Sequence, residues 1–318
     1  MVSSVIAAQQ RERPRWYTHG YNRADFYRLA AALSWLPRRG RLRLARTVGR
    51  FAIKLMPVEH GVVRTTLARV LETTDARRVD ALAVRTFMDF AMCFSDLMST
   101  NRQPVAQLMG CVGRVQGVDS VPTGAGLISL TAHVGNWEMA GRLLAGRSAR
   151  PTHVVVAEEE ALQLERWLRR DGDGVRFVTR TRPTVSLELV AALRRGEVVA
   201  VQGDRALGTR GDVLVPFFGH LAPFPLGPFV LARAVGMPML PAFCLLEADY
   251  RYTVRVVEPL AVARGGEEEA ARAWVAVLEN VVREYPTQWF NFFDVWNPWS
   301  GEPARPGGRI PTGTGARR

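Results

Sequence analysis

Two side chains that can exchange protons, His133 and Glu138, stand five positions apart in the segment LTAHVGNWEMAG. An imidazole is the side chain best suited to accept a proton near neutral pH. A nearby carboxylate can fix its tautomer and stabilise the imidazolium that forms during a reaction. The pair therefore indicates general base catalysis. Because two residues are a weak motif, a structural histidine beside an ordinary helix-start acid stays open as the alternative.

The elements around His133 determine where such a base would lie. Residues 126–131 have the apolar run of a buried strand, and residues 137–144 have the pattern of a helix. His133 is therefore expected at a strand-to-helix turn, at the carboxyl end of a strand. In open α/β sheets this is the edge at which ligands bind.

The spacing of the pair also requires a turn. Positions i and i+5 point about 140° apart on a continuous helix, so the two side chains would diverge. Gly135 supplies backbone freedom for a turn between them, and Asn136 is a good N-cap. With that cap, Glu138 falls in the first helical turn, where the helix dipole favours a carboxylate.

A second acid follows a different predicted strand. Asp204 and Arg205 come just after the apolar run 198–202, so they are also expected at a carboxyl strand end. Such an acid could orient a histidine, and the arginine could bind a phosphate or a carbonyl oxygen. A structural ion pair on a loop is the alternative.

An apolar, proline-rich segment comes next. Residues 213–219 (VLVPFFG) are followed by residues 222–228 (APFPLGP), which lead into a predicted helix at 227–235. Pro228 suits the first turn of a helix, and a helix amino end suits an anion. The segment suggests an apolar slot for an acyl chain, with a rigid hydrophobic turn as the alternative.

The pattern from residue 112 onward alternates between strands and helices. This alternation predicts the α/β class: a mixed, largely parallel central sheet flanked by helices, with amino-terminal amphipathic helices before it. The expected strands are 112–115, 127–131, 153–157, 175–179, 198–202, 239–245 and 252–257, and the expected helices are 137–145, 162–170, 185–194, 227–235 and 267–284.

The first third of the chain is helical in pattern. The segment PRRG at 37–40 is expected to break a helix that begins near Ala24, and the segment 41–56 alternates arginines with aliphatic residues. Such a helix suits a membrane surface or packing on the protein's own core. Helices are also expected at 64–71 and 79–98. The expected organisation is a disordered basic arm (1–20), a helical membrane-associating region (21–110), an α/β core (111–300) and a disordered tail (301–318).

The composition limits the functional class. The 318 residues carry 42 basic and 30 acidic side chains, a net charge of +12, and Lys54 is the only lysine. An arginine-rich surface favours anionic partners such as a membrane surface, although a GC-rich genome would give the same bias. No serine-hydrolase elbow, phosphate-binding loop or dinucleotide fingerprint occurs, and no pattern indicates nucleic-acid binding.

Other residues give no sign of a metal, a cofactor or a membrane span. Cys93, Cys111 and Cys244 lie among apolar residues without metal-binding spacing, so we expect buried thiols. No metal site is predicted. No window reaches 18 uninterrupted apolar residues, and no signal peptide is evident, so no transmembrane helix is expected.

Taken together, these blocks resemble one family. The block HVGNWE (133–138) is similar to the H-x4-E/D block of the lysophospholipid acyltransferase superfamily, in the branch of the lipid A late acyltransferases and the phosphatidylinositol mannoside acyltransferases. The other blocks agree in order and spacing over roughly residues 25–298: Asp204-Arg205, PFFG (216–219), Gly227-Pro228 and PTQWF (286–290).

The resemblance implies an enzymatic activity and a cellular location. It implies transfer of an acyl chain from an acyl thioester, on acyl-CoA or an acyl carrier protein, to a hydroxyl of a membrane glycolipid or phospholipid. It implies a peripheral enzyme on the cytoplasmic face of the bacterial plasma (inner) membrane. A thioester is already activated, so the reaction needs a base, an oxyanion stabiliser and positioning, and no cofactor beyond the thioester co-substrate.

The resemblance also implies roles for residues. His133 would be the general base, and Glu138, Asp204 or both would support the imidazole. Arg205 is the candidate for an oxyanion or phosphate contact. The resemblance also places substrate-binding residues in these blocks: Asn136, Arg205, Phe217, Phe218, Gly219 and Pro228.

Two departures from the family bear on the acceptor. Lipid A enzymes usually have Asp-Gln where this chain has Asp204-Arg205, which favours the mannoside-acylating side. A basic residue is usual after the strand 153–157, where this chain has three glutamates at 158–160. A non-catalytic membrane-binding protein and a lipid esterase or thioesterase stay open as alternatives.

Overall fold

The computed structural model describes residues 32, 35–100, 105–117, 119, 121, 125–148, 150–156, 174–180, 184–208 and 211–298. Several expectations lie outside these residues: the basic arm, most of the first predicted helix, the three glutamates, the helix predicted at 162–170 and the tail.

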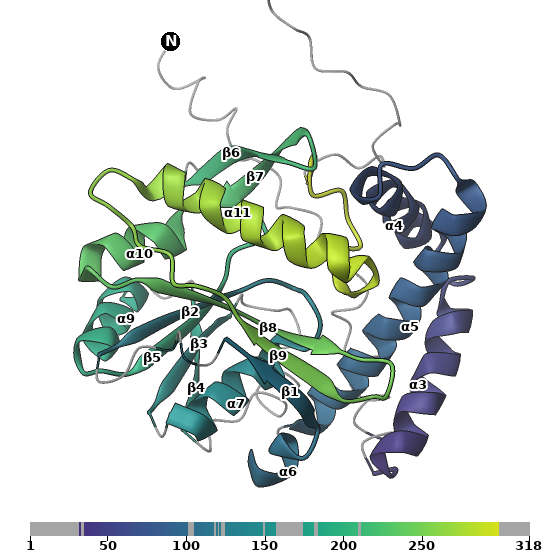
Figure 1. Cartoon of the computed structure of the whole chain (residues 1–318), viewed down its shortest axis with the longest axis horizontal. Helices are drawn as coiled ribbons and strands as arrows, with labels where there is room; N and C mark the ends of the chain where they lie inside the picture. Colours follow the sequence, from purple (N-terminus) through teal and green to yellow (C-terminus); the bar gives the residue numbers. More distant parts are fainter. Residues whose placement is uncertain are drawn as a thin grey trace, which may run out of the picture.

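A seven-stranded sheet forms the centre of the molecule (Figure 1). Its strands pair in parallel except for β8 and β9, which pair antiparallel. The predicted α/β class is confirmed, and β8 has the continuous apolar run expected of a strand buried on both faces. In spatial order the strands are β1 (Val112–Gln116), β9 (Tyr252–Val256), β8 (Met239–Leu246), β2 (Leu127–Thr131), β5 (Val198–Gln202), β3 (Thr152–Val156) and β4 (Val175–Thr179).

Helices cover both faces of this sheet (Figure 1). On one face α7 (Trp137–Ser148) packs on the strands and contacts α5 (Ala76–Thr100) and α6 (Val105–Met109). On the other face lie α9 (Val185–Arg194), α10 (Gly227–Val235) and α11 (Glu267–Glu284), all three at their predicted bounds. Every residue that these three helices bury is apolar, so this face forms the larger hydrophobic core.

The amino-terminal helices differ from their predicted bounds: the helix predicted at 41–56 spans 38–52, and the helix predicted at 64–71 begins earlier, at Pro57. The helix α3 (Arg38–Ala52) begins directly after Pro37, so Gly40 lies inside it and the predicted break at 37–40 is too long. Proline fixes its own φ, here −53°, and suits the position before a first turn. The helix α4 (Pro57–Val70) then starts at a second proline.

The helices α3 and α5 lie in direct contact, because Gly49 has no side chain. A Cβ atom on Gly49 would stand 2.5 Å from the main-chain oxygen of Phe87. No helix in the described part of the chain is long and apolar enough to cross a membrane.

The proline-rich segment forms a hairpin that the sequence did not predict. Strands β6 (Asp212–Phe217) and β7 (His220–Pro225) pair antiparallel as a separate two-stranded sheet. Both residues of its turn have positive φ, +48° at Phe218 and +73° at Gly219, as a two-residue hairpin loop requires. Proline is tolerated because each strand has a free edge.

Candidate active site

The turn after β2 forms as the sequence predicts. Gly135 has a φ of +60°, and a Cβ atom there would stand 2.1 Å from the main-chain oxygen of Cys244. The side chain of Asn136 caps α7, since its Oδ1 accepts a hydrogen bond from the backbone N–H of Met139 at 3.2 Å. The main chain of Asn136 also donates to the carbonyl of Cys244 at 2.8 Å, which fixes the turn against β8.

Adjacent strand ends bring His133 and Asp204 together. In the parallel register of β2 and β5, Thr131 lies opposite Gln202, so the residues two positions further on are neighbours. The Nδ1 atom of His133 lies 2.8 Å from Oδ1 of Asp204. The backbone N–H of His133 donates to the other oxygen, Oδ2, at 3.0 Å. One carboxylate therefore holds both the ring and the main chain of the histidine.

Neutral donors complete the surroundings of Asp204. The indole of Trp289 donates to Oδ2 at 3.2 Å, and the side-chain amide of Asn291 donates at 3.4 Å. Burial alone would raise the pKa of Asp204, but the charge and hydrogen bonds of His133 and the charge of Arg205 outweigh it. The pKa of this carboxyl is therefore held well below its usual value, and Asp204 is an anion at neutral pH.

This geometry sets the chemistry of the ring. An ionised carboxylate only accepts hydrogen bonds, so the Nδ1 atom of His133 carries a proton, and in the neutral ring Nε2 would carry the lone pair. The ring is only 11% exposed and lies 4.9 Å from the ring of Trp137, centroid to centroid. The arrangement is that of a histidine base whose tautomer is fixed by an acid.

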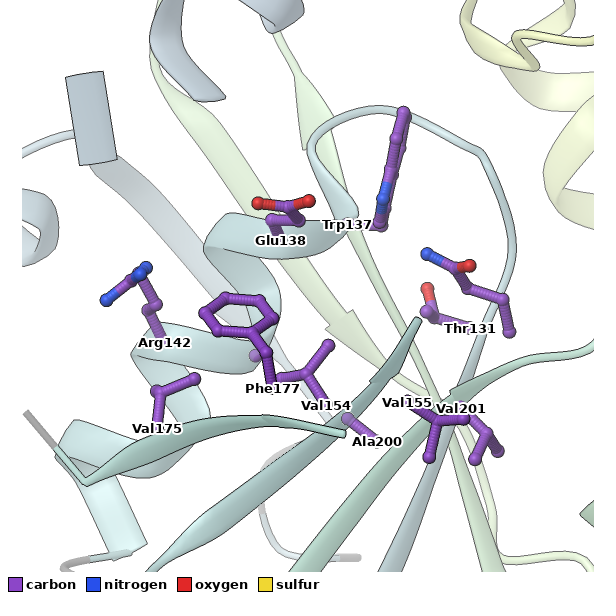
Figure 2. Close-up of a pocket in the computed structure, with 12 residues that line it drawn as sticks. Thr131, Trp137, Glu138, Arg142, Val154, Val155, Val175, Phe177, Ala200 and Val201 are labelled. Atoms are coloured by element: carbon purple, nitrogen blue, oxygen red, sulfur yellow. The ribbon is translucent and has the colours of Figure 1, made fainter. Parts of the chain in front are cut away.

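A cavity lies beneath α7, and Trp137, whose ring contacts the ring of His133, is part of its lining (Figure 2). Its interior is small, about 20 Å³ for the centre of a water molecule and so room for about one water, and most of its lining is aliphatic or aromatic. Glu138 lines this cavity, whereas Asp204 is the partner of Nδ1. The lining residues are Thr131, Trp137, Glu138, Gly141, Arg142, Val154, Val155, Val175, Phe177, Ala200, Val201 and Gln202.

Arg205 is engaged with the segment after η4 (Pro286–Gln288). Its Nε donates to Oδ1 of Asn291 at 2.9 Å, and its Nη2 donates to the carbonyl of Phe290 at 2.9 Å. Asn291 in turn donates to Asp204. In this structure the side chain therefore holds the segment that surrounds Asp204.

The hairpin residues lie behind the site. Phe217 is fully buried, and its ring meets the ring of Trp289 edge-on at 5.2 Å. Phe218 and Gly219 form the hairpin turn. Pro228 opens α10, on the face of α9 and α11, and within the described residues no hydrogen bond joins it to His133 or Asp204.

Sequence reasoning missed the contribution of Trp289 and Asn291. Both lie in the aromatic run after η4, which stood out only by its composition and its resemblance to a family block. The backbone supplies a further link there, because the N–H of Phe290 donates to the carbonyl of His133 at 2.8 Å. A run of adjacent hydrogen-bonding and aromatic residues was the only available signal.

The fold and the site define a class: an α/β protein with a buried histidine–aspartate pair at the carboxyl edge of a largely parallel sheet. Residues 26–297 match the family described as bacterial lipid A biosynthesis acyltransferase. The chain belongs to this family and is an acyltransferase family enzyme, which confirms the resemblance found in its sequence blocks.

Individual relatives agree with this family. The chain is 26% identical over 243 residues to a phosphatidylinositol mannoside acyltransferase of Mycobacterium tuberculosis, which covers 74% of this chain and 76% of the relative. It is 26% identical over 181 residues to the protein of the same name from Mycolicibacterium smegmatis, covering 56% and 59%. A solved structure, the 1-acyl-sn-glycerophosphate acyltransferase from Thermotoga maritima, matches 80% of this chain and all of its own chain at 17% identity, with a TM-score of 0.38.

Proposed function

We propose that this enzyme transfers a fatty acyl chain from an acyl thioester, on acyl-CoA or an acyl carrier protein, to a hydroxyl of a membrane lipid. The observation that carries the proposal is the His133–Asp204 pair, in which Nδ1 is bound to the carboxylate and Nε2 is the nitrogen that would accept the proton. The names of the mycobacterial relatives support a glycolipid acceptor, with attack by a sugar hydroxyl.

The proposed reaction uses the base twice. The Nε2 atom of His133 takes the proton of the acceptor hydroxyl while the oxygen attacks the thioester carbonyl, and Asp204 stabilises the imidazolium. When the tetrahedral intermediate collapses, the carbon–sulfur bond breaks and the imidazolium returns the proton to the leaving thiolate. The products are an ester and a free thiol.

We place the carbonyl end of the acyl chain at the cavity beneath α7, which would have to widen to hold the whole chain because its interior has room for only about one water molecule. Its floor is apolar, and Trp137 joins it to the histidine because that ring both lines the cavity and contacts the ring of His133. Glu138 stands at the same cavity and would act near the thioester rather than on Nδ1. Arg205 would keep the 289–291 segment in place around Asp204.

The exposed surface of α3 supports a peripheral location of the enzyme on the cytoplasmic face of the inner membrane. The exposed side of α3 carries an apolar stripe that continues one turn past its end, formed by Leu44, Val48, Phe51 and Leu55. No acidic residue occurs between Trp35 and Val58, while six arginines lie in α3 itself. An apolar stripe bordered by arginines fits an anionic bilayer surface.

The test is an acyl transfer assay with a matched histidine control. Purified protein receives a radiolabelled acyl thioester and vesicles that contain a mannosylated phosphoinositide or a lysophospholipid. We expect His133→Ala to lower transfer by about a thousandfold while the protein stays folded, as its circular dichroism spectrum would show. His153→Ala removes a second buried histidine, on β3, and should leave the rate near that of the wild type.

Two outcomes would overturn the proposal. Full transfer by His133→Ala would exclude this histidine as the base. Release of free fatty acid without any acceptor, at a rate equal to the transfer rate, would indicate a thioesterase instead.

A further inference from the structure

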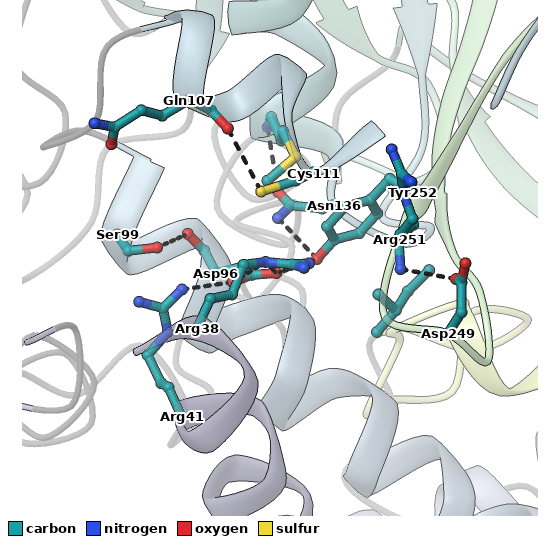
Figure 3. Close-up of polar contacts among 12 residues, drawn as sticks. Arg38, Arg41, Asp96, Ser99, Gln107, Cys111, Asn136, Asp249, Arg251 and Tyr252 are labelled. Atoms are coloured by element: carbon teal, nitrogen blue, oxygen red, sulfur yellow. Dashed lines mark hydrogen bonds and ion pairs between the residues drawn. The ribbon is translucent and has the colours of Figure 1, made fainter. Parts of the chain in front are cut away.

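A buried polar chain begins at the contact between α3 and α5 (Figure 3). Asp96 of α5 is 1% exposed, and its carboxylate pairs with two arginines of α3. Arg38 contacts it at 2.7 Å through Nη2, and Arg41, itself buried, contacts it at 2.6 Å. The same carboxylate accepts a hydrogen bond from the hydroxyl of Tyr252 on β9 at 3.0 Å.

The chain continues from Tyr252 to the active-site turn. The side-chain amide of Asn136 lies 3.4 Å from the tyrosine oxygen, with Nδ2 as the donor. Tyr252 and Asn136 are both fully buried. Burial and the charge of Asp96 raise the pKa of Tyr252 well above its usual value, so the hydroxyl keeps the proton that it donates.

The direction of these hydrogen bonds is fixed. The carboxylate of Asp96 can only accept, so the hydroxyl of Tyr252 donates to it and must accept from Asn136. That contact turns Nδ2 of Asn136 toward Tyr252 and leaves Oδ1 for the N–H of Met139. Tyr252 therefore sets the orientation in which Asn136 caps α7.

Asn136 stands between His133 and Glu138 in the sequence. His133 lies three positions before it and Glu138 two positions after it. A rotated Asn136 would leave the first turn of α7 uncapped and loosen the turn that carries His133.

At its other end, the chain reaches the helix with the exposed apolar stripe. Arg38 and Arg41 project from α3 toward Asp96, while Phe51 and Leu55 are exposed at 56% and 85%. Because Gly49 brings the backbones of α3 and α5 into contact, a shift of α3 would change the positions of the arginines that bind Asp96.

We propose that Tyr252 is a positioning residue that couples α3 to the active-site turn, so that docking of α3 on an anionic bilayer stabilises the catalytic conformation of the His133 loop. The inference rests on the proposed function in one respect, the membrane contact of α3. It assigns no substrate contact to Tyr252, which acts through Asp96 and Asn136.

The experiment compares Tyr252→Phe with Tyr285→Phe. The first keeps the buried ring and removes the hydroxyl that links Asp96 to Asn136. The second removes a hydroxyl that binds Glu247, outside this chain of contacts. Hydrogen exchange of the backbone amides at 136–144 is followed by mass spectrometry, with and without phosphatidylglycerol vesicles.

Vesicles should slow exchange in this segment for the wild type and for Tyr285→Phe, and leave Tyr252→Phe unprotected although it binds vesicles equally well. On a vesicle-borne acceptor, kcat of Tyr252→Phe should fall by about tenfold with an unchanged KM. Asn136→Ser, which keeps a capping oxygen but loses the contact to Tyr252, should behave like Tyr252→Phe.

The proposal is overturned if Tyr252→Phe keeps the vesicle-induced protection, if Tyr285→Phe loses it equally, or if vesicles do not protect the wild type. Absence of acyl transfer by the wild type would instead refute the proposed function, because the exchange measurement does not depend on turnover.

Discussion

Two histidine–carboxylate pairs lie at opposite ends of one strand. His133 binds Asp204, which follows β5, through Nδ1 at 2.8 Å, whereas His153 binds Glu197, which precedes β5, through Nε2 at 2.7 Å. The pairs differ in surroundings. Glu197 also binds Arg195 through two hydrogen bonds, while the other groups that donate to Asp204 are neutral.

The difference shows that a short histidine–carboxylate contact does not by itself define a catalytic base. At Asp204 the negative charge is directed at the imidazole, at the carboxyl edge of the sheet, where ligands bind in open α/β folds. At Glu197 a guanidinium shares the carboxylate, and the pair joins the amino ends of β3 and β5. The first pair suits proton transfer, and the second suits structural linkage.

The largest expected effect is on the acyl transfer rate, when the carboxylate of each pair is replaced in turn. Asp204→Asn should lower the acyl transfer rate by about a thousandfold, because the amide neither fixes the tautomer nor stabilises the imidazolium. Glu197→Gln should leave the rate within about twofold, since its pair is a linkage near the surface. Steady-state measurements of acyl transfer by the two purified variants check this. Similar losses of activity in both variants would show that the two pairs do not differ in role.

The next effect tests one glycine near each pair, Gly135 two residues after His133 and Gly196 directly before Glu197. Gly135→Ala should lower the rate by about a hundredfold, because the new Cβ would stand 2.1 Å from the oxygen of Cys244 and displace the His133 turn. Gly196 also has a positive φ, +83°, but no atom lies within 4 Å of its Cβ position.

Gly196→Ala should therefore cost about 1 kcal/mol of stability through backbone strain and leave the rate unchanged. Thermal unfolding and the transfer rate of each variant separate the two effects. A rate loss in Gly196→Ala as large as that in Gly135→Ala would contradict the assignment of only one turn to catalysis.

The smallest effect is the pH dependence of the structural pair. The hydrogen bonds from Arg195, aided by the bond and charge of His153, lower the pKa of Glu197 to about 2. A lowered pKa contributes stability that is present above the unfolded value of about 4.3 and is lost as the pH falls toward the folded value.

Urea unfolding at pH 6 should therefore show Glu197→Gln as less stable than the wild type, by no more than about 1 kcal/mol because Arg195 is exposed to solvent. At pH 3 the difference in the free energy of unfolding between the two proteins should be smaller. A difference that stays constant between the two pH values would mean that the ionisation of Glu197 does not contribute to stability.

Much of the fold follows from local patterns. The central strands and the helices α9, α10 and α11 appear at or near their predicted bounds, because continuous apolar runs and three- to four-residue spacings specify them directly. The hairpin of β6 and β7 escaped prediction, since Pro216 and Pro223 argue against strands unless each strand has a free edge.

The sequence by itself determined the turn at Gly135, the cap at Asn136 and the place of His133 at a strand end, because each depends on neighbouring residues. Only the tertiary structure decided that Asp204 binds Nδ1, since the pairing of β2 with β5 brings together residues 71 positions apart. The same holds for Trp289, Asn291 and Tyr252, whose hydrogen bonds to the site depend on how distant segments pack and not on any local pattern.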